Sequence, residues 1–258
     1  MILDEIVASK RAIHAAREPV SLDELTARAA AMPPARPFGA ALRVRDRVTA
    51  IAEFKRRSPS AGLIRPGADP EEIARQYERG GAAAISVLTD VQFFDGDPAH
   101  VDRARQACAL PILRKDFLLD ERDLAEARLL NADAALLIVR LLPAATLARL
   151  VAYAGTIGLG ALVEAHDDRE LEVALEAGAR VLGVNHRDLD TLRIDLALSA
   201  RARALAGPEV VLVAESGLKT RDDVARMRTH GVDAILVGET LMKAPSPGAA
   251  LLELLTWS

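Results

Sequence analysis

Glu53 and Lys55 are an acid and a base separated by one residue, at the end of an apolar run that begins at Val48. Side chains two residues apart on a strand point to the same side. The two charges would therefore emerge together where a buried strand reaches the surface. Taken alone, the pair fits a surface salt bridge as well as an acid and base that move protons, so the decision depends on whether the pattern recurs.

The pattern does recur. The ends of the successive apolar runs carry Glu53 and Lys55, Thr89 and Asp90, Lys115 and Asp116, Val139 and Arg140, Glu164, Asn185 and Arg187, Glu215 and Ser216, and Gly238 and Glu239. The beginnings of the runs carry Ala, Val, Leu and Pro instead. Scattered surface charge would not sort in this way, so we interpret these ends as one functional mouth.

An alternation of strands and helices must position these groups. Strand-like runs lie at 48–54, 83–89, 111–115, 134–139, 159–164, 181–185, 210–215 and 234–238. Helical patterns lie at 69–80, 98–108, 121–130, 143–155, 168–177, 196–206, 220–230 and 248–255. This βα unit repeats about every 25 residues, which predicts a (β/α)8 TIM barrel with its active site at the carboxyl ends of the strands. An open doubly wound sheet is the alternative, but it would normally show a glycine fingerprint after its first strand.

The first 47 residues look helical and contain no convincing strand. Ser21 and Glu24 have the spacing of a capping box that opens a helix. We therefore predict one domain over residues 1–258, with a helical N-terminal extension at 1–47 packed across one end of a barrel at 48–258.

Composition excludes several classes of function. A chain of 258 residues that is 50% hydrophobic, with a formal net charge of -4, suits an α/β domain and shows no basic face for nucleic acid. Its longest apolar runs have strand length, so no membrane segment is expected, and the start of the chain lacks signal-peptide features. The single Cys108 suggests a packed small side chain and a reducing, cytoplasmic location. No spacing of Cys or His indicates a metal site.

The last two strand ends suggest a phosphate group. Ser216-Gly217 and Gly238-Glu239 follow strands seven and eight, where barrels often bind phosphate through backbone N–H groups and a short helix start. Glycine lets an anion approach the backbone closely. Glu239 would have to contribute its N–H while its carboxylate turns away.

Eight segments resemble the indole-3-glycerol-phosphate synthase family of tryptophan biosynthesis. They read IAEFKRRSPSAGLI, ISVLTDVQFFDGD, PILRKDF, LLIVR, LVEAH, VNHRDLDTL, VAESGL and LVGETLM, in this order. The resemblance runs from about residue 45 to the end and includes the helical extension. It implies a carboxy-lyase, a carbon–carbon lyase that closes the pyrrole ring of 1-(2-carboxyphenylamino)-1-deoxyribulose 5-phosphate and releases carbon dioxide and water. It implies no cofactor and no metal, and a phosphorylated small-molecule substrate.

The resemblance also implies roles for individual residues. It matches Lys115 to the general acid, Glu164 to the general base and Glu53 to a second catalytic carboxylate. It matches Lys55 to a cation that holds the substrate carboxylate, and Asn185 to a polar group that orients the substrate.

Further residues match substrate-binding positions. The matched set comprises Arg187 near the carboxylate, Glu215 and Ser216 on the floor, Pro59, Phe94, Phe117, Leu136 and Leu189 around the aromatic ring, and Ser58 as a further substrate-binding residue. His186 and Glu239 depart from residues common in the family. Some members cover the site with an N-terminal aromatic residue, whereas the first Phe, Tyr or Trp of this chain is Phe38. We interpret His166 and His186 as supporting or surface polar residues.

Three alternatives remain open. A Schiff-base aldolase would use a neutral Lys at a strand end. A sugar-phosphate isomerase would be expected to use a Cys and an Asp, but Cys108 lies in a helix away from the mouth. A non-catalytic ligand-binding barrel would be expected to lack one of Glu53, Lys115 or Glu164, and all three are present.

Overall fold

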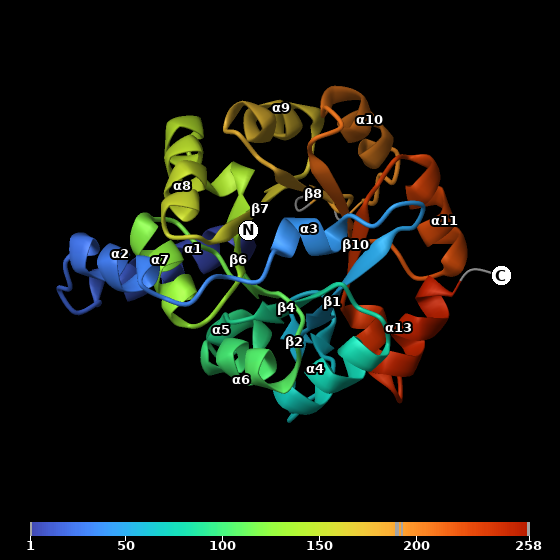
Figure 1. Ribbon diagram of the computed structural model, residues 1–258, viewed down its shortest axis with the longest axis horizontal. Coiled ribbons are helices and arrows are strands. Elements are labelled where there is room, and N and C mark those ends of the chain that lie inside the picture. The colour runs from blue at the N-terminus through green and yellow to red at the C-terminus, as the bar shows by residue number, and fades with distance from the viewer. Residues whose placement is uncertain (1, 189–190, 192, 257–258) are drawn as a thin grey trace.

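The computed structural model describes residues 2–188, 191 and 193–256. Eight parallel strands close into a barrel in the order β1-β10-β9-β8-β7-β6-β5-β4, and Figure 1 shows this ring inside a layer of helices. The strands are β1 (Thr49–Phe54), β4 (Ala84–Leu88), β5 (Ile112–Lys115), β6 (Ala134–Ile138), β7 (Gly160–Ala165), β8 (Val181–Asn185), β9 (Val211–Glu215) and β10 (Ala234–Val237). The predicted (β/α)8 barrel is confirmed.

The outer layer contains the helices that the sequence predicts. They are α4 (Pro70–Arg79), α6 (Ala99–Ala107), α7 (Glu121–Leu129), α8 (Ala144–Thr156), α9 (Asp168–Glu176), α10 (Leu198–Leu205), α11 (Arg221–Thr229) and α13 (Pro247–Leu255). Asp69 and Thr220 cap α4 and α11 by accepting bonds from backbone N–H groups of the first turn. Several short elements are additional: α3 (Phe38–Leu42), β2 (Arg57–Ser58), β3 (Gly62–Leu63), α5 (Val91–Phe94), the 3-10 turn η1 (Val139–Leu141) and α12 (Glu239–Lys243).

Side chains alternate along each strand between two hydrophobic cores, one inside the barrel and one between the barrel and the helices. On β1, Ala50, Ala52 and Phe54 pack outward against the helices, whereas Ile51 belongs to the cluster inside the barrel. On β9, Leu212 likewise belongs to the outer core and its neighbours on either side belong to the inner one. Because side chains alternate with a period of two, the residues two positions beyond the inner apolar ones also point into the barrel, at its mouth.

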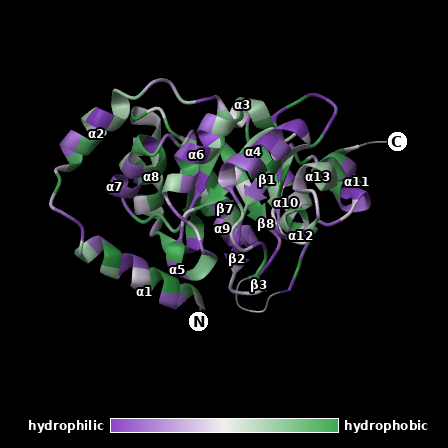
Figure 2. Ribbon diagram, turned by 90° about the horizontal axis from the view of Figure 1, so that it is seen from below, coloured by the Kyte–Doolittle hydropathy of each residue, from purple (hydrophilic) through white to green (hydrophobic). Residues whose placement is uncertain are grey.

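The N-terminal extension runs from one end of the barrel to the other. Its first helix, α1 (Ile2–Ala15), lies beside α5 at the mouth, and α3 lies at the opposite end, as Figure 2 shows. Between them α2 (Leu22–Ala30) packs against α7. Phe38 and Leu42 of α3 are buried in the cluster inside the barrel, so α3 closes its base.

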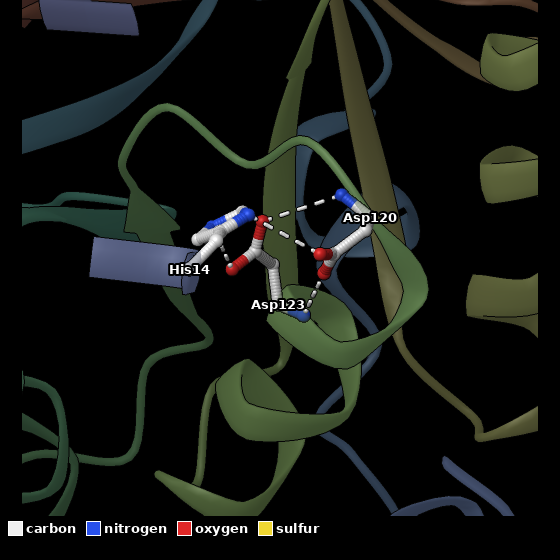
Figure 3. A group of neighbouring side chains, drawn as sticks. All are labelled: His14, Asp120 and Asp123. Carbon is white, nitrogen blue, oxygen red and sulfur yellow. Dashed lines mark hydrogen bonds and ion pairs between the residues drawn. The ribbon is translucent and has the colours of Figure 1, made fainter. Parts of the chain in front are cut away.

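Polar and charged side chains join α1 to the start of α7, and Figure 3 shows three of them. His14 Nδ1 lies 3.2 Å from Asp120 Oδ2, and His14 Nε2 lies 3.1 Å from Asp123 Oδ1. The guanidinium of Arg17 pairs with both aspartates. In the described part of the chain, no helix combines the length and the apolar composition needed to cross a membrane.

Candidate active site

The polar groups at the mouth continue the inward-facing series of their strands. Glu53, Lys115, Glu164 and Glu215 each stand two residues beyond an inner apolar residue on β1, β5, β7 and β9. All three carboxylates are at most 3% exposed. Charged groups at such depth are costly unless they are paired, so their mutual arrangement decides what the site does.

Lys115 lies at the centre of this arrangement. Its Nζ is 2.9 Å from Glu164 Oε2 and 3.2 Å from Glu215 Oε2. Asn185 of β8 donates from Nδ2 to Glu164 Oε1 over 3.1 Å. Glu53 acts on Lys115 through its charge and pairs directly with Lys55, at 2.7 Å between Nζ and Oε1. All five residues matched to catalytic positions therefore meet at one mouth.

The site shifts the pKa values of its two contacting glutamates, Glu164 and Glu215, in opposite directions. Burial disfavours the charged amine of Lys115, but the surrounding carboxylates outweigh burial and raise its pKa. Burial also works against an ionised Glu164, yet Lys115 and His166 hold the pKa of Glu164 well below its usual range. Burial and the neighbouring charge of Glu164 raise the pKa of Glu215 to about 8. At neutral pH the group therefore contains a charged lysine, an ionised glutamate and a protonated glutamate.

Two glycines make room for these carboxylates. A Cβ at Gly183 of β8 would lie 2.4 Å from Glu215 Oε1, and a Cβ at Gly238 would lie 2.5 Å from Glu53 Oε1. The sequence-based explanation of Gly238 as an opening for an anion is therefore incomplete, because the side chain of Glu53 already occupies that space. Either glycine replaced by alanine would push a buried carboxylate out of position.

His166 adds a second charged partner to Glu164. Its Nε2 lies 3.1 Å from Glu164 Oε1 and its Nδ1 lies 3.0 Å from Glu170 Oε2. Glu170 in turn pairs with Arg140 at 2.9 Å. Burial lowers the pKa of His166, but the two carboxylates outweigh burial and raise it to about 9. The interpretation of His166 as merely supporting understates its position, since it contacts the proposed base directly.

The cations predicted to bind the substrate carboxylate lie on the same side of the mouth. The backbone N–H of Arg187 donates to Asn185 Oδ1 over 3.1 Å. Glu239 turns its carboxylate to Lys243, at 2.6 Å, which is the largest influence lowering its pKa. The charges of Lys55 and Arg187 lower the pKa of Glu239 further, so both cations face this region.

The loop after β9 has a strained backbone conformation supported from below. Ser216 and Gly217 have φ values of 65° and 77°, in the left-handed region that costs a non-glycine residue free energy. His186 is buried, with Nδ1 3.0 Å from the Ser216 carbonyl oxygen and Nε2 2.7 Å from Ser199 Oγ. His186 is therefore a support for this loop, as its interpretation from the sequence anticipated. Across from it, Gly238 is the N-cap of α12.

The residues expected around an aromatic substrate ring come from several elements, including β2, α5 and β6. Phe94 and Phe117 stack in a tilted pair with ring centroids 6.0 Å apart, and Leu136 is buried inside the barrel, in the cluster that Phe117 packs against. Ser58 is buried and accepts a bond from the Ala61 N–H, whereas Pro59 beside it is exposed. Leu189 lies outside the described residues.

Sequence reasoning missed one residue at the mouth altogether. Lys10 of α1 reaches two buried aspartates, Asp90 and Asp116, at 3.0 and 2.6 Å. Both aspartates were visible as strand-end residues. Helical periodicity places Lys10 on α1 but says nothing of where that helix docks, so no signal in the sequence identified the contact.

The cluster of His14, Asp120 and Asp123 could in principle present ligand atoms to a cation, since these atoms lie within 4.8 Å of one another. The charges are already complemented, because Arg17 pairs with both carboxylates and, with His14, lowers the pKa of Asp123 against the effect of burial. The group therefore serves to attach α1. Cys108 packs as expected: it is buried, and burial raises its pKa.

Comparison with known proteins agrees with the geometry. A sequence model described as "Indole-3-glycerol phosphate synthase" matches residues 3–254. The chain is 53% identical over 228 residues to indole-3-glycerol phosphate synthase 2 of Streptomyces coelicolor, covering 88% of each chain. It is 46% identical to the indole-3-glycerol phosphate synthase of Aromatoleum aromaticum, covering 98% of each.

Solved structures with low sequence identity share the fold. A thiamine phosphate pyrophosphorylase from Pyrococcus furiosus superposes with a TM-score of 0.62 at 19% identity, over 84% of this chain and 95% of the other. Identity at this level supports the barrel architecture alone.

Proposed function

Since the chain belongs to the indole-3-glycerol phosphate synthase family, we propose that Lys115, Glu164 and Glu53 carry its chemistry at the barrel mouth. The enzyme is a carbon–carbon lyase of tryptophan biosynthesis. It converts 1-(2-carboxyphenylamino)-1-deoxyribulose 5-phosphate to indole-3-glycerol phosphate, carbon dioxide and water. The reaction comprises a ring closure, a decarboxylation and a dehydration, and each step makes its own demand on these side chains.

Ring closure needs an acid. As the aryl carbon that bears the carboxylate bonds to the ketone carbon, negative charge develops on the ketone oxygen. Lys115 donates a proton to this oxygen, a task suited to a cation that its neighbours keep protonated. Decarboxylation follows when the carbon–carboxylate bond breaks and its electrons restore the aromatic ring.

Decarboxylation also needs the carboxylate to leave the plane of the ring. Lys55 and Arg187 hold it as an ionic clamp while the apolar residues hold the ring. The pairing is supported by the charges of Lys55 and Arg187, which both lower the pKa of Glu239 after the hydrogen bond from Lys243. Binding at the clamp requires Lys55 to exchange Glu53 for the substrate carboxylate, which leaves Glu53 available to act on the substrate.

Dehydration needs an acid and a base together. The hydroxyl oxygen already carries the proton received in ring closure. Lys115, which regains a proton from water, donates a second one so that the group leaves as water. Glu164 takes a proton from the carbon next to the nitrogen, which balances the proton delivered to the leaving group. Its low pKa keeps it ionised for this role. Glu215 has a buried Oε1 with no hydrogen-bond partner among the described residues, so it offers a hydrogen bond to a substrate hydroxyl.

The phosphate group binds between the loops after β9 and β10. Ser216-Gly217 provides a backbone turn, and Glu239 opens α12 with a first-turn N–H that has no intrahelical acceptor. The ion pair of Glu239 with Lys243 turns the carboxylate away from that N–H. The tilted pair of Phe94 and Phe117, with Leu136, forms the wall for the aromatic ring.

The observation that carries the proposal is the position of Lys115 among three buried glutamates, with ionised Glu164 and protonated Glu215 in direct contact and Glu53 acting through its charge. It disfavours a Schiff-base aldolase, whose lysine must be neutral to attack. An assay of indole fluorescence on addition of the substrate tests the activity. A crystal grown with phosphate tests the site: the anion should lie between Ser216-Gly217 and Gly238-Glu239. Phosphate bound elsewhere, with those N–H groups bonded to protein, would contradict the assignment.

A further inference from the structure

Lys10 is a partly buried cation that the proposed chemistry does not use. It lies on α1, and its side chain is only 11% exposed. Its Nζ is 3.0 Å from Asp90 Oδ2 and 2.6 Å from Asp116 Oδ1, and each of these side chains is 3% exposed. One ammonium thus bridges two carboxylates that follow different strands of the barrel, β4 and β5.

Asp90 connects this bridge to α5. It is the N-cap of that helix, and its Oδ1 accepts the Phe93 N–H over 2.7 Å. An N-cap bond of this kind fixes the direction in which the chain enters the helix. The last residue of α5 is Phe94, so the orientation of Asp90 governs where this ring is placed.

Asp116 connects the same bridge to Phe117. Its Oδ1 accepts the Phe117 N–H over 2.8 Å, while its Oδ2 accepts a bond from Thr89 Oγ1 over 2.5 Å. Arg114 also reaches Oδ2, at 3.3 Å. The carboxylate is therefore fixed at one oxygen by the barrel wall and at the other by Lys10 and the backbone of Phe117.

Asp90 and Asp116 therefore position the two rings of one aromatic pair. Phe94 and Phe117 are partners, with ring centroids 6.0 Å apart. Asp116 holds the backbone N–H of Phe117 itself, and Asp90 holds that of Phe93, the residue before Phe94. Without the ammonium, two buried carboxylates would repel each other across the same space. The loops after β4 and β5 would then lose the ammonium that joins them, and the spacing of the two rings would no longer be fixed by it.

We propose that Lys10 is a positioning residue for the aromatic wall of the substrate site. By holding Asp90 and Asp116 on one ammonium, it fixes the separation of Phe94 and Phe117 and hence the slot for the aryl ring. Lys10 does not touch the reacting atoms. The inference rests on the assignment of Phe94 and Phe117 to the aryl site under the proposed function.

The second attachment of α1 offers a matched control. Arg17 binds Asp123 and Asp120 one to two turns further along the same part of the chain, and it has no contact with either carboxylate that Lys10 holds. If Lys10 only docked α1, loss of Arg17 would have a comparable effect. If Lys10 sets the slot, only its own loss should alter aryl binding.

The experiment compares Lys10→Met, Lys10→Arg and Arg17→Met, with circular dichroism to check folding. Each variant is assayed for KM and kcat and for inhibition by 2-aminobenzoate and by inorganic phosphate. Lys10→Met should raise KM and the inhibition constant of 2-aminobenzoate roughly tenfold, a change that corresponds to about 1.4 kcal/mol. It should leave phosphate inhibition unchanged and kcat within about threefold. Lys10→Arg should restore aryl binding at least in part, because it retains the charge, and Arg17→Met should leave both inhibition constants unchanged.

Three results would overturn the inference. The first is that Lys10→Met weakens the binding of 2-aminobenzoate and of phosphate equally. The second is that Arg17→Met weakens 2-aminobenzoate binding as much as Lys10→Met does. The third is that Lys10→Met leaves the inhibition constant of 2-aminobenzoate unchanged. Phe94→Ala and Phe117→Ala distinguish this failure from failure of the underlying assignment. If neither variant weakens the binding of 2-aminobenzoate, the assignment of Phe94 and Phe117 to the aryl wall is wrong. If Lys10→Met fails to fold, Lys10→Gln gives the same comparison with a polar side chain.

Discussion

Buried carboxylates lie at both ends of the barrel, and they are held in different ways. At the base, Asp133 precedes β6 and accepts the N–H groups of Arg36 and Ile112, at 2.6 and 2.9 Å, while it also pairs with Arg105. Asp233, which is only partly buried, precedes β10 in the same way and accepts the Leu212 N–H at 2.8 Å. Both aspartates therefore join one strand to its neighbour through the backbone.

At the mouth the carboxylates are held mainly by other side chains. Glu164 and Glu215 share Lys115, and Glu53 pairs with Lys55. One oxygen of Glu215 has no hydrogen-bond partner among the described residues. Asp133 and Asp233 bond to backbone N–H groups and so stabilise the fold, whereas the glutamates grouped around Lys115 and Lys55 retain hydrogen-bonding capacity for a substrate.

The largest expected effect is at the centre of the mouth. Lys115→Met removes the acid of ring closure, and loss of one general acid typically costs roughly 10²–10⁴-fold in rate. We expect kcat to fall by this amount while the substrate still binds. Steady-state kinetics and calorimetric titration of the inactive variant measure the two quantities. Normal turnover in Lys115→Met would contradict the distinction between a catalytic mouth and a structural base of the barrel.

The clamp gives the next largest effect. Lys55→Met should lower kcat/KM strongly, because removal of one partner of a desolvated charge pair costs on the order of 2–5 kcal/mol. The control is a phosphorylated analogue that lacks the carboxylate, whose binding should be much less affected. Equal losses for both ligands would show that Lys55 does not hold the carboxylate.

At the base, a substitution should affect stability and spare activity. Asp133→Asn replaces one of the two acceptor oxygens by a donor, which then faces the N–H of Arg36 or of Ile112, and it leaves Arg105 without its charge partner, at a cost on the order of 3 kcal/mol. Denaturant unfolding should show this loss, with kcat of the folded enzyme unchanged. Asp46→Asn, at an aspartate whose side chain is 84% exposed, is the matched control. A large fall in kcat for Asp133→Asn would mean that the base is not purely structural.

His166 lies at the mouth but should give a smaller and pH-dependent effect. Its pKa in the folded protein is about 9, above the usual 6.5. The stability that it contributes is therefore complete below about pH 6.5 and is lost as pH rises through 9. In His166→Gln the deficit in unfolding free energy should be largest at low pH, on the order of 2–3 kcal/mol, and should shrink above neutrality.

The same substitution should also change the pH–rate profile. Loss of the imidazolium removes a charge that lowers the pKa of Glu164, so the acid limb of kcat/KM should move to higher pH. His230→Gln, at the C-cap of α11, is the control and should leave the limb in place. An unchanged limb in His166→Gln would show that His166 does not act on the base.

The sequence predicted the repeated part of the fold closely. Strands and major helices fall within about two residues of their expected bounds, because a period of two in the barrel wall and Gly or Asp at element boundaries are local signals. It did not predict α3, α5, α12 or the β2–β3 hairpin, whose two to five residues are too short to show a period.

The site was predictable where it follows from the repeat. Strand ends revealed Lys115, Glu164 and Glu215, since the topology of a barrel brings all such ends together. The role of Gly238 beside Glu53 and the contact of Lys10 with Asp90 depend on packing between distant segments. Composition and spacing contain no information about such contacts.

The protonation state of Lys115 is the central claim, and one measurement tests it directly. The wild-type protein is incubated with substrate and borohydride, and the mass of the intact chain is determined. A lysine held in its charged form by Glu164 and the other glutamates around it should donate protons and form no imine, so the mass should stay unchanged while substrate is consumed. A stable mass increase localised to Lys115 would show covalent attachment and would contradict the acid role assigned to it.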